Sequence, residues 1–396
     1  MKGNRSMLRS ICWIFAAVAA PLHLAAAQPA AAQPGVVLEE FVFISSPNFR
    51  SCHAATVLES PAGDLLTAFF GGTAESHPDV EIRLSRKPAG GSWTAPVSVA
   101  DGAEPGVQRM STGNPVLFQP KGSDVMLFYK VIRPKVGFVG RVKSSSDGGR
   151  TWGAASEVGD GLMGAVKNKP VQIAGGAILS PSSTEDRHGW RVHIERSTDG
   201  GKSWKLIGPI NPDARIGAIQ PTLLTYADGR IQMLCRTRSE HERMAQSWSG
   251  DGGLTWSPLE IATLPNNNSG FDAVTLRDGR QLMAYNHSTR EQPGMGHKGR
   301  GILNVALSRD GINWEASLIL DYIDQPGKQF SYPSVIQTSD GLVHIVYTWH
   351  RQRIKHVVLD PRLLKTTPMP NGEWPATGPF SLKAAQARWR AQQGLK

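Results

Sequence analysis

Polar residues able to bind or protonate a ligand gather where short predicted strands begin or end. They carry cationic, amide, imidazole, carboxylate and phenol groups: His53, Glu75, Asp79, Asn114, Lys169, Gln220, Arg236, Arg238, Asp272, Asn286, Arg300 and Tyr332. Each of these residues, taken alone, is explained equally well as a loop residue that forms hydrogen bonds within the protein. Polar groups that converge on one concave site are, however, the usual sign of a binding pocket. The set as a whole therefore predicts a cavity for a sugar or an anion.

The elements that must position these residues repeat along the chain. The phrase Ser-x-Asp-Gly-Gly-x-Ser/Thr-Trp occurs at 145–152, 197–204 and 249–256, with a shortened copy at 308–314 and a worn copy, lacking the aspartate, at 85–93. The aspartate can bond nearby backbone N–H groups, the glycines supply positive φ, and the tryptophan anchors the turn. The closing tryptophans are 52 to 59 residues apart. A period of this size predicts an array of equivalent structural units.

Each unit contains four predicted strands. An alternating polar and apolar run precedes each Asp-turn, and a further strand pair around a second turn precedes that run. Six such strand–turn–strand signals occur, near Asp64, Lys121, Gly175, Asp228, Asp278 and Asp340. We therefore predict an all-β fold, a six-bladed β-propeller of four-stranded antiparallel blades. The N-terminal run 36–44 is predicted to supply the outer strand of the last blade and close the ring.

The Asp-turns are predicted to lie at the outer rim of the blades, so their aspartates are interpreted as structural. The binding site is predicted at one end of the central axis, where the innermost strands start. The propeller fold alone does not indicate a function, because one fold hosts many activities.

The chain is predicted to have four parts: a signal peptide (1–27), a flexible leader (28–35), the propeller (36–380) and a C-terminal tail (381–396). Basic residues, an apolar stretch and a small-residue cleavage site mark the signal. The apolar stretch is short and interrupted by Pro21, which argues against stable membrane insertion. We expect an exported protein, periplasmic or extracellular. Cys52 and Cys235 fall on opposite blades and are expected to be free, buried thiols.

Formal net charge is +10, and three of the positives lie in the predicted signal. A solvated basic surface explains this charge, and attraction of anionic substrates is the functional alternative. No dense Lys/Arg run interleaved with aromatic residues suggests nucleic acid. His53, His77 and His297 lack the spacing of metal ligands, and no Gly-rich phosphate loop suggests a cofactor. We therefore expect a monomer that uses neither metal nor cofactor.

With its Asp-turns, the chain resembles the sialidase superfamily of Asp-box (BNR) repeat proteins, and more closely the bacterial predicted-neuraminidase branch, over residues 36–358. The segment 233–238, which contains Arg236 and Arg238, resembles the strand that carries the second of three arginines that hold the substrate carboxylate in that family, and Arg300 resembles the third. The first falls on His53. Tyr332 matches the catalytic tyrosine.

Two further positions carry the resemblance. Glu75 and Asp79 lie in the loop that holds the family's acid/base aspartate. Gln220 occupies the position of the glutamate that polarises the tyrosine. A neutral glutamine cannot take the proton of a phenol. This departure puts the tyrosine-nucleophile mechanism, and sialic acid as the substrate, in question.

The resemblance implies an exo-acting glycoside hydrolase that cleaves a terminal, acidic sugar from glycans. Glu75 or Asp79 would protonate the leaving oxygen, and Tyr332 would attack the anomeric carbon or stabilise its positive charge. His53 would be a second acid/base or a ligand of a sugar hydroxyl. The remaining candidates would bind substrate: Arg236, Arg238, Arg300, Lys169, Asn114, Gln220, Asp272 and Asn286. The alternative is a carbohydrate-binding propeller without catalysis, which Gln220 and His53 favour.

Overall fold

The computed structural model describes residues 33–46, 48–213 and 215–393. The predicted signal peptide (1–27) and most of the predicted leader (28–32) lie outside these residues. Within the described part, no helix is long and apolar enough to cross a membrane.

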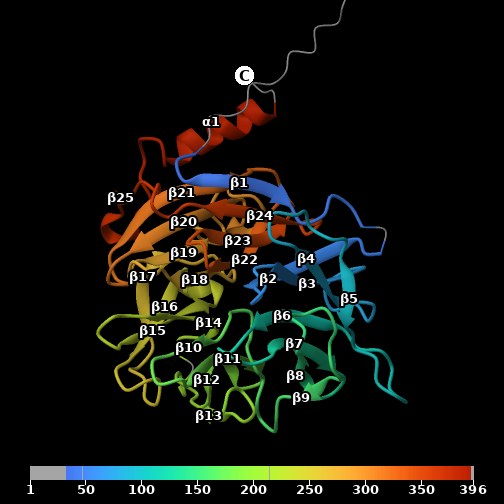
Figure 1. The fold of residues 1–396 in the computed structure, drawn as a ribbon. Helices are drawn as coiled ribbons and strands as arrows, with labels where there is room; N and C mark the ends of the chain where they lie inside the picture. The colour runs from blue at the N-terminus through green and yellow to red at the C-terminus, as the bar shows by residue number, and fades with distance from the viewer. Residues whose placement is uncertain (1–32, 47, 214, 394–396) are drawn as a thin grey trace, which may run out of the picture. The chain divides into compact units, whose positions relative to one another are not determined.

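Six antiparallel sheets are arranged as the blades of a propeller, which confirms the predicted fold (Figure 1). Blade one contains β2 (Ser51–Glu59), β3 (Leu65–Gly72), β4 (Glu81–Lys87) and β5 (Val97–Ala100), and blade two contains β6 (Thr112–Phe118), β7 (Val125–Arg133), β8 (Gly137–Ser145) and β9 (Ser156–Glu157). Blade three contains β10 (Val171–Gln172), β11 (Ile178–Asp186), β12 (Gly189–Ser197) and β13 (Lys205–Ile207), and blade four contains β14 (Ala218–Thr225), β15 (Ile231–Thr237), β16 (Arg243–Ser249) and β17 (Glu260–Pro265).

Blades five and six depart from a simple run of four consecutive strands. Blade five contains β18 (Asp272–Thr275), β19 (Gln281–Tyr285), β20 (Ile302–Ser308), β21 (Trp314–Tyr322) and a fifth strand, β25 (Thr367–Pro368). Blade six contains β22 (Phe330–Gln337), β23 (Val343–Trp349), β24 (Arg353–Leu359) and, on its outer edge, β1 (Val36–Phe41). Blade five contains the four predicted strands, to which β25 adds a fifth at the edge, and the closure by the N-terminal strand is confirmed.

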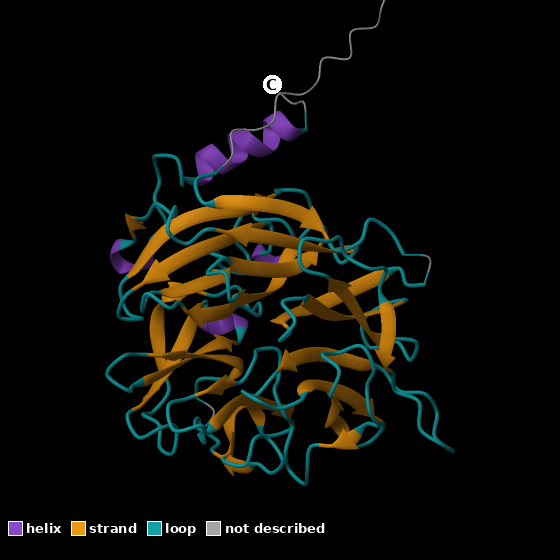
Figure 2. Cartoon of the chain, viewed as in Figure 1, coloured by secondary structure: helices purple, strands orange, loops and turns teal. Residues whose placement is uncertain are grey.

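Short helices accompany the sheets (Figure 2). Single 3₁₀ turns span Ser239–His241 (η1), His297–Gly299 (η2) and Pro370–Gly372 (η3). The predicted C-terminal tail contains α1 (Leu382–Gln392), whose first turn is capped by the Ser381 side chain accepting from the N–H of Ala384. The ring of Trp389 in α1 lies 6.1 Å from that of Tyr322 in β21.

The Asp-turns join the third and fourth strands of blades two to five and hold themselves together. Asp199 Oδ1 accepts from the N–H groups of Lys202 and Ser203, each at 3.0 Å, and Oδ2 accepts from the Ser203 hydroxyl. These bonds lower the pKa of Asp199 below its ordinary value. The ring of Trp204 meets Phe128 of blade two edge-on at 6.0 Å. The aspartates are therefore structural, as predicted.

Apolar side chains fill the space between neighbouring blades. Phe69, Phe128 and Tyr285 are among the largest fully buried side chains. Burying one such side chain contributes about 1.5–3 kcal/mol. Cys52 and Cys235 are both buried and unpaired, as expected. This packing fixes the innermost strands, on which the axial residues depend.

Candidate active site

Four innermost strands are bulged at the same level. Ala54, Asn114, Gln220 and Tyr332 have φ between 46° and 55°, and the ladder to the second strand shifts register beside each of them. Such bulges re-aim a side chain and carry a conformational cost in residues other than glycine. Proline follows Asn114, Gln220 and Tyr332. Because proline has no N–H, it leaves no unpaired donor where the ladder is interrupted.

Blades three and five place residues at this level too. Lys167 has φ 72° and precedes β10. A Cβ on Gly270, which precedes β18, would lie 3.1 Å from Gln220 Oε1, 3.1 Å from Lys167 Cε and 3.4 Å from Tyr332 Cδ1. The residues of blades three to six therefore meet at one point near the axis, and glycine at 270 lets them approach.

Tyr332, Arg236 and Gln220 form a hydrogen-bonded triangle. Arg236 Nη1 donates to the phenol oxygen of Tyr332 and, at 3.0 Å, to Gln220 Oε1. Gln220 Nε2 donates to the same phenol oxygen at 3.3 Å. The phenol oxygen thus faces two donors, one of them charged, and both would stabilise negative charge on it.

Cations surround the ring of Tyr332. The guanidinium carbons of Arg236 and Arg300 each lie 5.8 Å from the ring centroid, and Lys167 Nζ lies 5.9 Å from it. The His53 ring lies 4.3 Å from the Tyr332 ring, tilted by 50°. Of the residues that the sequence assigned to catalysis or substrate binding, the structure brings five together: His53, Gln220, Arg236, Arg300 and Tyr332.

Asn268 fixes both arginines of this cluster. Its Oδ1 accepts from Arg236 Nε at 2.8 Å and Nη2 at 2.6 Å, and its carbonyl accepts from Arg300 Nη2 at 2.9 Å. Gln329 Oε1 accepts from Arg300 Nη1 at 3.4 Å, while Arg300 Nε is buried without a partner among the described residues. Two oriented guanidinium groups of this kind suit a planar carboxylate.

His53 is a neutral imidazole in this environment. Burial lowers its pKa well below the ordinary value, and the charges of Arg351, Arg300, Arg236 and Lys167 add to the effect. Its Nδ1 lies 3.0 Å from Thr348 Oγ1. A ring that does not carry a proton at neutral pH can orient a sugar hydroxyl but is a poor general acid.

Lys167 is a buried lysine that the sequence analysis did not select. Its Nζ donates to Asn168 Oδ1 at 2.9 Å and to the carbonyls of Phe271 and Pro333. Burial lowers its pKa to about 7, Asp272 opposes the shift, and the charges of Lys169 and Arg236 add to it. Lys167 lies nine residues before the turn glycine Gly176 of its blade. Gln220 and Tyr332 lie nine residues before Gly229 and Gly341, the turn glycines of their own blades, so this shared register could have identified Lys167.

Arg351 adds a cation from blade six. It follows His350 in the turn between β23 and β24, where both residues have positive φ, and its carbonyl accepts from the N–H of Cys52 in β2 at 2.9 Å. Arg351 Nη1 donates to Glu75 Oε2 at 2.7 Å, and Glu75 is exposed. No repeat or motif in the sequence marks this turn, so Arg351 could not be recognised before the chain was folded.

The two candidate acids differ sharply. Asp79 accepts from the Thr73 hydroxyl at 2.7 Å and from His77 Nδ1 at 2.7 Å, so it organises its own loop. Burial would raise the pKa of Asp79, but these bonds and that of the Thr73 N–H lower it overall. Asp79 is therefore held in place, whereas Glu75 has one hydrogen-bond partner among the described residues, Arg351, and can turn toward a ligand.

Lys169 and Asp272 pair with each other. Lys169 Nζ lies 2.9 Å from Asp272 Oδ2, which also accepts from the N–H of Val335, and Thr222 Oγ1 donates to the other carboxylate oxygen. Asp272 has no exposed surface. A fully buried carboxylate with all these partners holds blades three to six together, so its assignment to substrate binding does not hold in this structure.

Asn286 is also structural. It is buried, and its Nδ2 donates to the carbonyls of Ile302 and Phe330, which ties blade five to blade six. Arg238, in contrast, is exposed, and its guanidinium lies 5.4 Å from the ring centroid of Trp190, which also faces Arg236 at 5.3 Å. Asn114 is partly exposed at its bulge. A substrate contact of Arg238 and Asn114 stays a prediction.

Comparison with known proteins identifies the family. Residues 63–345 match the model of the BNR repeat-like domain. The curated sialidase of Micromonospora viridifaciens is 26% identical over 329 residues, which cover 78% of this chain and 46% of that protein. The chain therefore spans about half the length of this relative.

Solved structures share the fold at low identity. A protein of unknown function from Dyadobacter fermentans has a TM-score of 0.65 at 18% identity, over 84% of this chain and 99% of that one. A Hadza microbial sialidase has a TM-score of 0.69 at 15% identity, over 83% of this chain and 69% of that one. The six-bladed fold, the axial cluster around Tyr332 and the matched domain lead to one assignment: the chain belongs to the BNR repeat-like family of the sialidase superfamily.

Proposed function

We propose that the protein is an exo-acting glycoside hydrolase that removes a terminal acidic sugar from glycans. The observation that carries the proposal is the cluster in which the Tyr332 phenol accepts from Arg236 and Gln220 while Arg300 faces its ring. Family membership supports sialidase-type glycoside hydrolysis in general. The acidic character of the sugar rests on the excess of cations around the phenol. Export through the predicted signal would bring the protein to such glycans.

The arginines hold the anionic group of the sugar. Arg236 and Arg300 are oriented by Asn268, and Arg351 has only Glu75 as its carboxylate partner among the described residues. A substrate carboxylate that takes the place of Glu75 on Arg351 leaves the Glu75 side chain free to turn toward the glycosidic oxygen. Binding of an acidic sugar would in this way also position the acid.

The chemical step uses Glu75 and Tyr332. Protonated Glu75 transfers its proton to the glycosidic oxygen as the bond from that oxygen to the anomeric carbon breaks. The phenol oxygen of Tyr332 faces the cationic carbon that forms. A water molecule then adds to this carbon and returns a proton to Glu75, which completes hydrolysis. Asp79 is not assigned as the acid because its hydrogen bonds to Thr73 and His77 hold it within its own loop.

One observation favours a carbohydrate-binding propeller as the second candidate. Gln220 lies where a base for the phenol would be needed, and an amide cannot accept that proton. In the hydrolase proposal Tyr332 therefore keeps its proton and faces the cationic carbon with its phenol oxygen, which accepts from Arg236 and Gln220. A protein that only binds would hold an acidic sugar at the same cluster without turnover.

Dependence on the leaving group tests the role of Glu75. A 4-nitrophenyl glycoside leaves without protonation, whereas a methyl glycoside needs the acid. With sialic acid and uronic acid glycosides as probes, Glu75→Gln should lower kcat/KM by about 100-fold or more for methyl glycosides and by much less for nitrophenyl ones. Glu291→Gln, an exposed position, is the control and should change neither. Equal losses on both glycosides would show that Glu75 is not the acid.

A further inference from the structure

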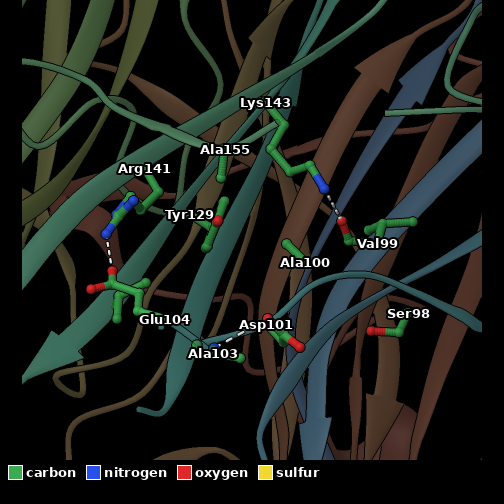
Figure 3. Close-up of a pocket in the computed structure, with 12 residues that line it drawn as sticks. Ser98, Val99, Ala100, Asp101, Ala103, Glu104, Tyr129, Arg141, Lys143 and Ala155 are labelled. Atoms are coloured by element: carbon green, nitrogen blue, oxygen red, sulfur yellow. Dashed lines mark hydrogen bonds and ion pairs between the residues drawn. The ribbon is translucent and has the colours of Figure 1, made fainter. Parts of the chain in front are cut away.

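A second polar pocket lies between blades one and two, away from the axial cluster (Figure 3). Its volume is about 320 Å³, which is at the lower end of the roughly 300–1,000 Å³ of small-molecule sites. Its walls come from β5 and the loop 101–104 on one side and from β7 and β8 on the other. None of its lining residues belongs to the axial cluster, so any ligand of this pocket would be bound independently of the proposed hydrolysis.

Tyr129 of β7 brings to this pocket a hydroxyl that has no hydrogen-bond partner among the described residues. Its side chain is buried, with 3% of its surface exposed, and no hydrogen bond to its hydroxyl is made by the described residues. Burial raises its pKa to about 12, and Asp101 and Glu104 add to the shift while Arg141 opposes it. The hydroxyl is therefore neutral, and it is able both to donate to and to accept from a ligand.

Lys143 of β8 lies on the same wall. Its Nζ donates to the carbonyl of Val99 at 2.8 Å, which leaves two N–H groups of the ammonium for a ligand. The nearby Arg141 donates from Nη2 to Glu104, and its Nε is buried without a partner in the described part of the chain. This wall therefore presents more hydrogen-bond donors than there are acceptors for them among the described residues.

The opposite wall is acidic and partly free. Asp101 Oδ1 accepts from the N–H of Ala103 at 3.1 Å, while Oδ2 is 3.8 Å from Arg109, its nearest cation. An anion bound here would face Asp101 and Glu104, and a cation would face Lys143 and Arg141. A neutral group that both donates and accepts satisfies both walls, and a pair of sugar hydroxyls has this property.

We propose that this pocket binds one neutral pyranose residue of a glycan, with neighbouring hydroxyls accepting from Lys143, pairing with Tyr129 and donating to Asp101. The loop 101–104 continues through residues 105–111 to β6, whose bulge residue Asn114 lies at the axial level.

Calorimetry with D-galactose, D-glucose and N-acetyl-D-glucosamine tests the site. The full chain carrying Tyr332→Phe serves as background, so that hydrolysis does not interfere. At least one of these sugars should bind saturably, and Tyr129→Phe and Lys143→Met should each weaken its binding by about tenfold, which is about 1.4 kcal/mol. Lys205→Met, an exposed lysine on β13, should leave binding unchanged.

A separate measurement distinguishes this site from the proposed hydrolase. In the protein with Tyr332 intact, Tyr129→Phe and Lys143→Met should leave turnover of a small nitrophenyl glycoside unchanged, whether that turnover is fast or absent. If Tyr129→Phe unfolds the chain, the sugar binding and turnover of Lys143→Met alone test the proposal. Absence of saturable binding for all three sugars, or binding that neither substitution weakens, would overturn the proposal.

Discussion

At the scale of single residues, Gln220 determines how Tyr332 can act. A carboxylate in its place would accept from Arg236 and take the phenol's proton. The amide accepts from Arg236 through Oε1 and donates to the phenol oxygen through Nε2. The phenol oxygen therefore has two donors and no base. The sequence revealed this substitution because the turn spacing fixed its register, but the hydrogen-bond geometry needed the folded chain.

Gly270→Ala tests how closely the axial residues must meet. The added Cβ would press on Gln220 Oε1 and Lys167 Cε at 3.1 Å, so we expect Tyr332 and Gln220 to shift. Activity should fall by about tenfold or more, and over-packing should cost about 1–3 kcal/mol of stability. Gly250→Ala meets no atom within 4 Å and is the control for the assay and the melting curve. Wild-type activity in Gly270→Ala would contradict the assigned geometry.

Arg351→Met tests whether the blade-six cation contributes to binding. The loss of one charged hydrogen bond to an anionic sugar should raise KM by about 10- to 100-fold, since such bonds contribute about 1.5–3 kcal/mol. Arg215→Met, with the side chain 87% exposed, is the matched control. A KM that stays unchanged for anionic substrates would remove Arg351 from the site.

At the scale of elements, β1 closes the ring with one carboxylate. Glu40 Oε1 accepts from Lys87 Nζ at 2.6 Å and Trp93 Nε1 at 2.9 Å in blade one, and lies 2.9 Å from His356 Nδ1 in blade six. The last blade lacks an Asp-turn and a fourth strand of its own, which was enough to predict that the N-terminal run closes it. β25 escaped prediction because its pairing covers two residues only, 367 and 368, which carry no alternation.

Glu40→Gln should weaken the closure in a pH-dependent way. The hydrogen bond with His356 is the main cause that lowers the pKa of Glu40 from 4.5 to about 2. The ionised form therefore stabilises the fold fully above pH 4.5, and this stabilisation is lost as the pH falls toward 2.

Thermal melting as a function of pH measures this effect. At pH 7, Glu40→Gln should be less stable than the wild type by about 1 kcal/mol, a value reduced because the carboxylate is partly solvent-exposed. The difference should shrink as the pH falls from 4.5 toward 2. Glu291→Gln should show no such trend. A pH-independent difference would show that the charge of Glu40 does not act in the closure.

At the scale of the whole molecule, the net charge of +10 and the cations at the axis would both attract anionic substrates. The repeat period and the turn chemistry were sufficient to predict the six-bladed ring. The roles of Lys169 and Asp272 were not predictable, because Lys169 precedes an inner strand and Asp272 begins one, as ligand-binding residues would. Only their mutual contact, buried between blades, identifies them as structural.

Salt dependence tests this long-range attraction. The kcat/KM for an anionic glycoside should fall several-fold between about 0.01 and 0.15 M ionic strength, over which the Debye length shrinks from about 30 to 8 Å. Binding of a neutral pyranose at the pocket between blades one and two should not change. An anionic substrate that shows no salt dependence would contradict the electrostatic contribution.

The central claim is that Tyr332 and its arginines carry out hydrolysis of a terminal acidic sugar. Mass spectrometry of monosaccharides released from glycans ending in sialic, uronic or neutral sugars, with wild type and Tyr332→Phe in parallel, tests it most directly. We predict release of an acidic monosaccharide by the wild type and a rate at least about 100-fold lower for Tyr332→Phe. Saturable binding of an acidic glycan without release by the wild type, or full activity in Tyr332→Phe, would contradict the account.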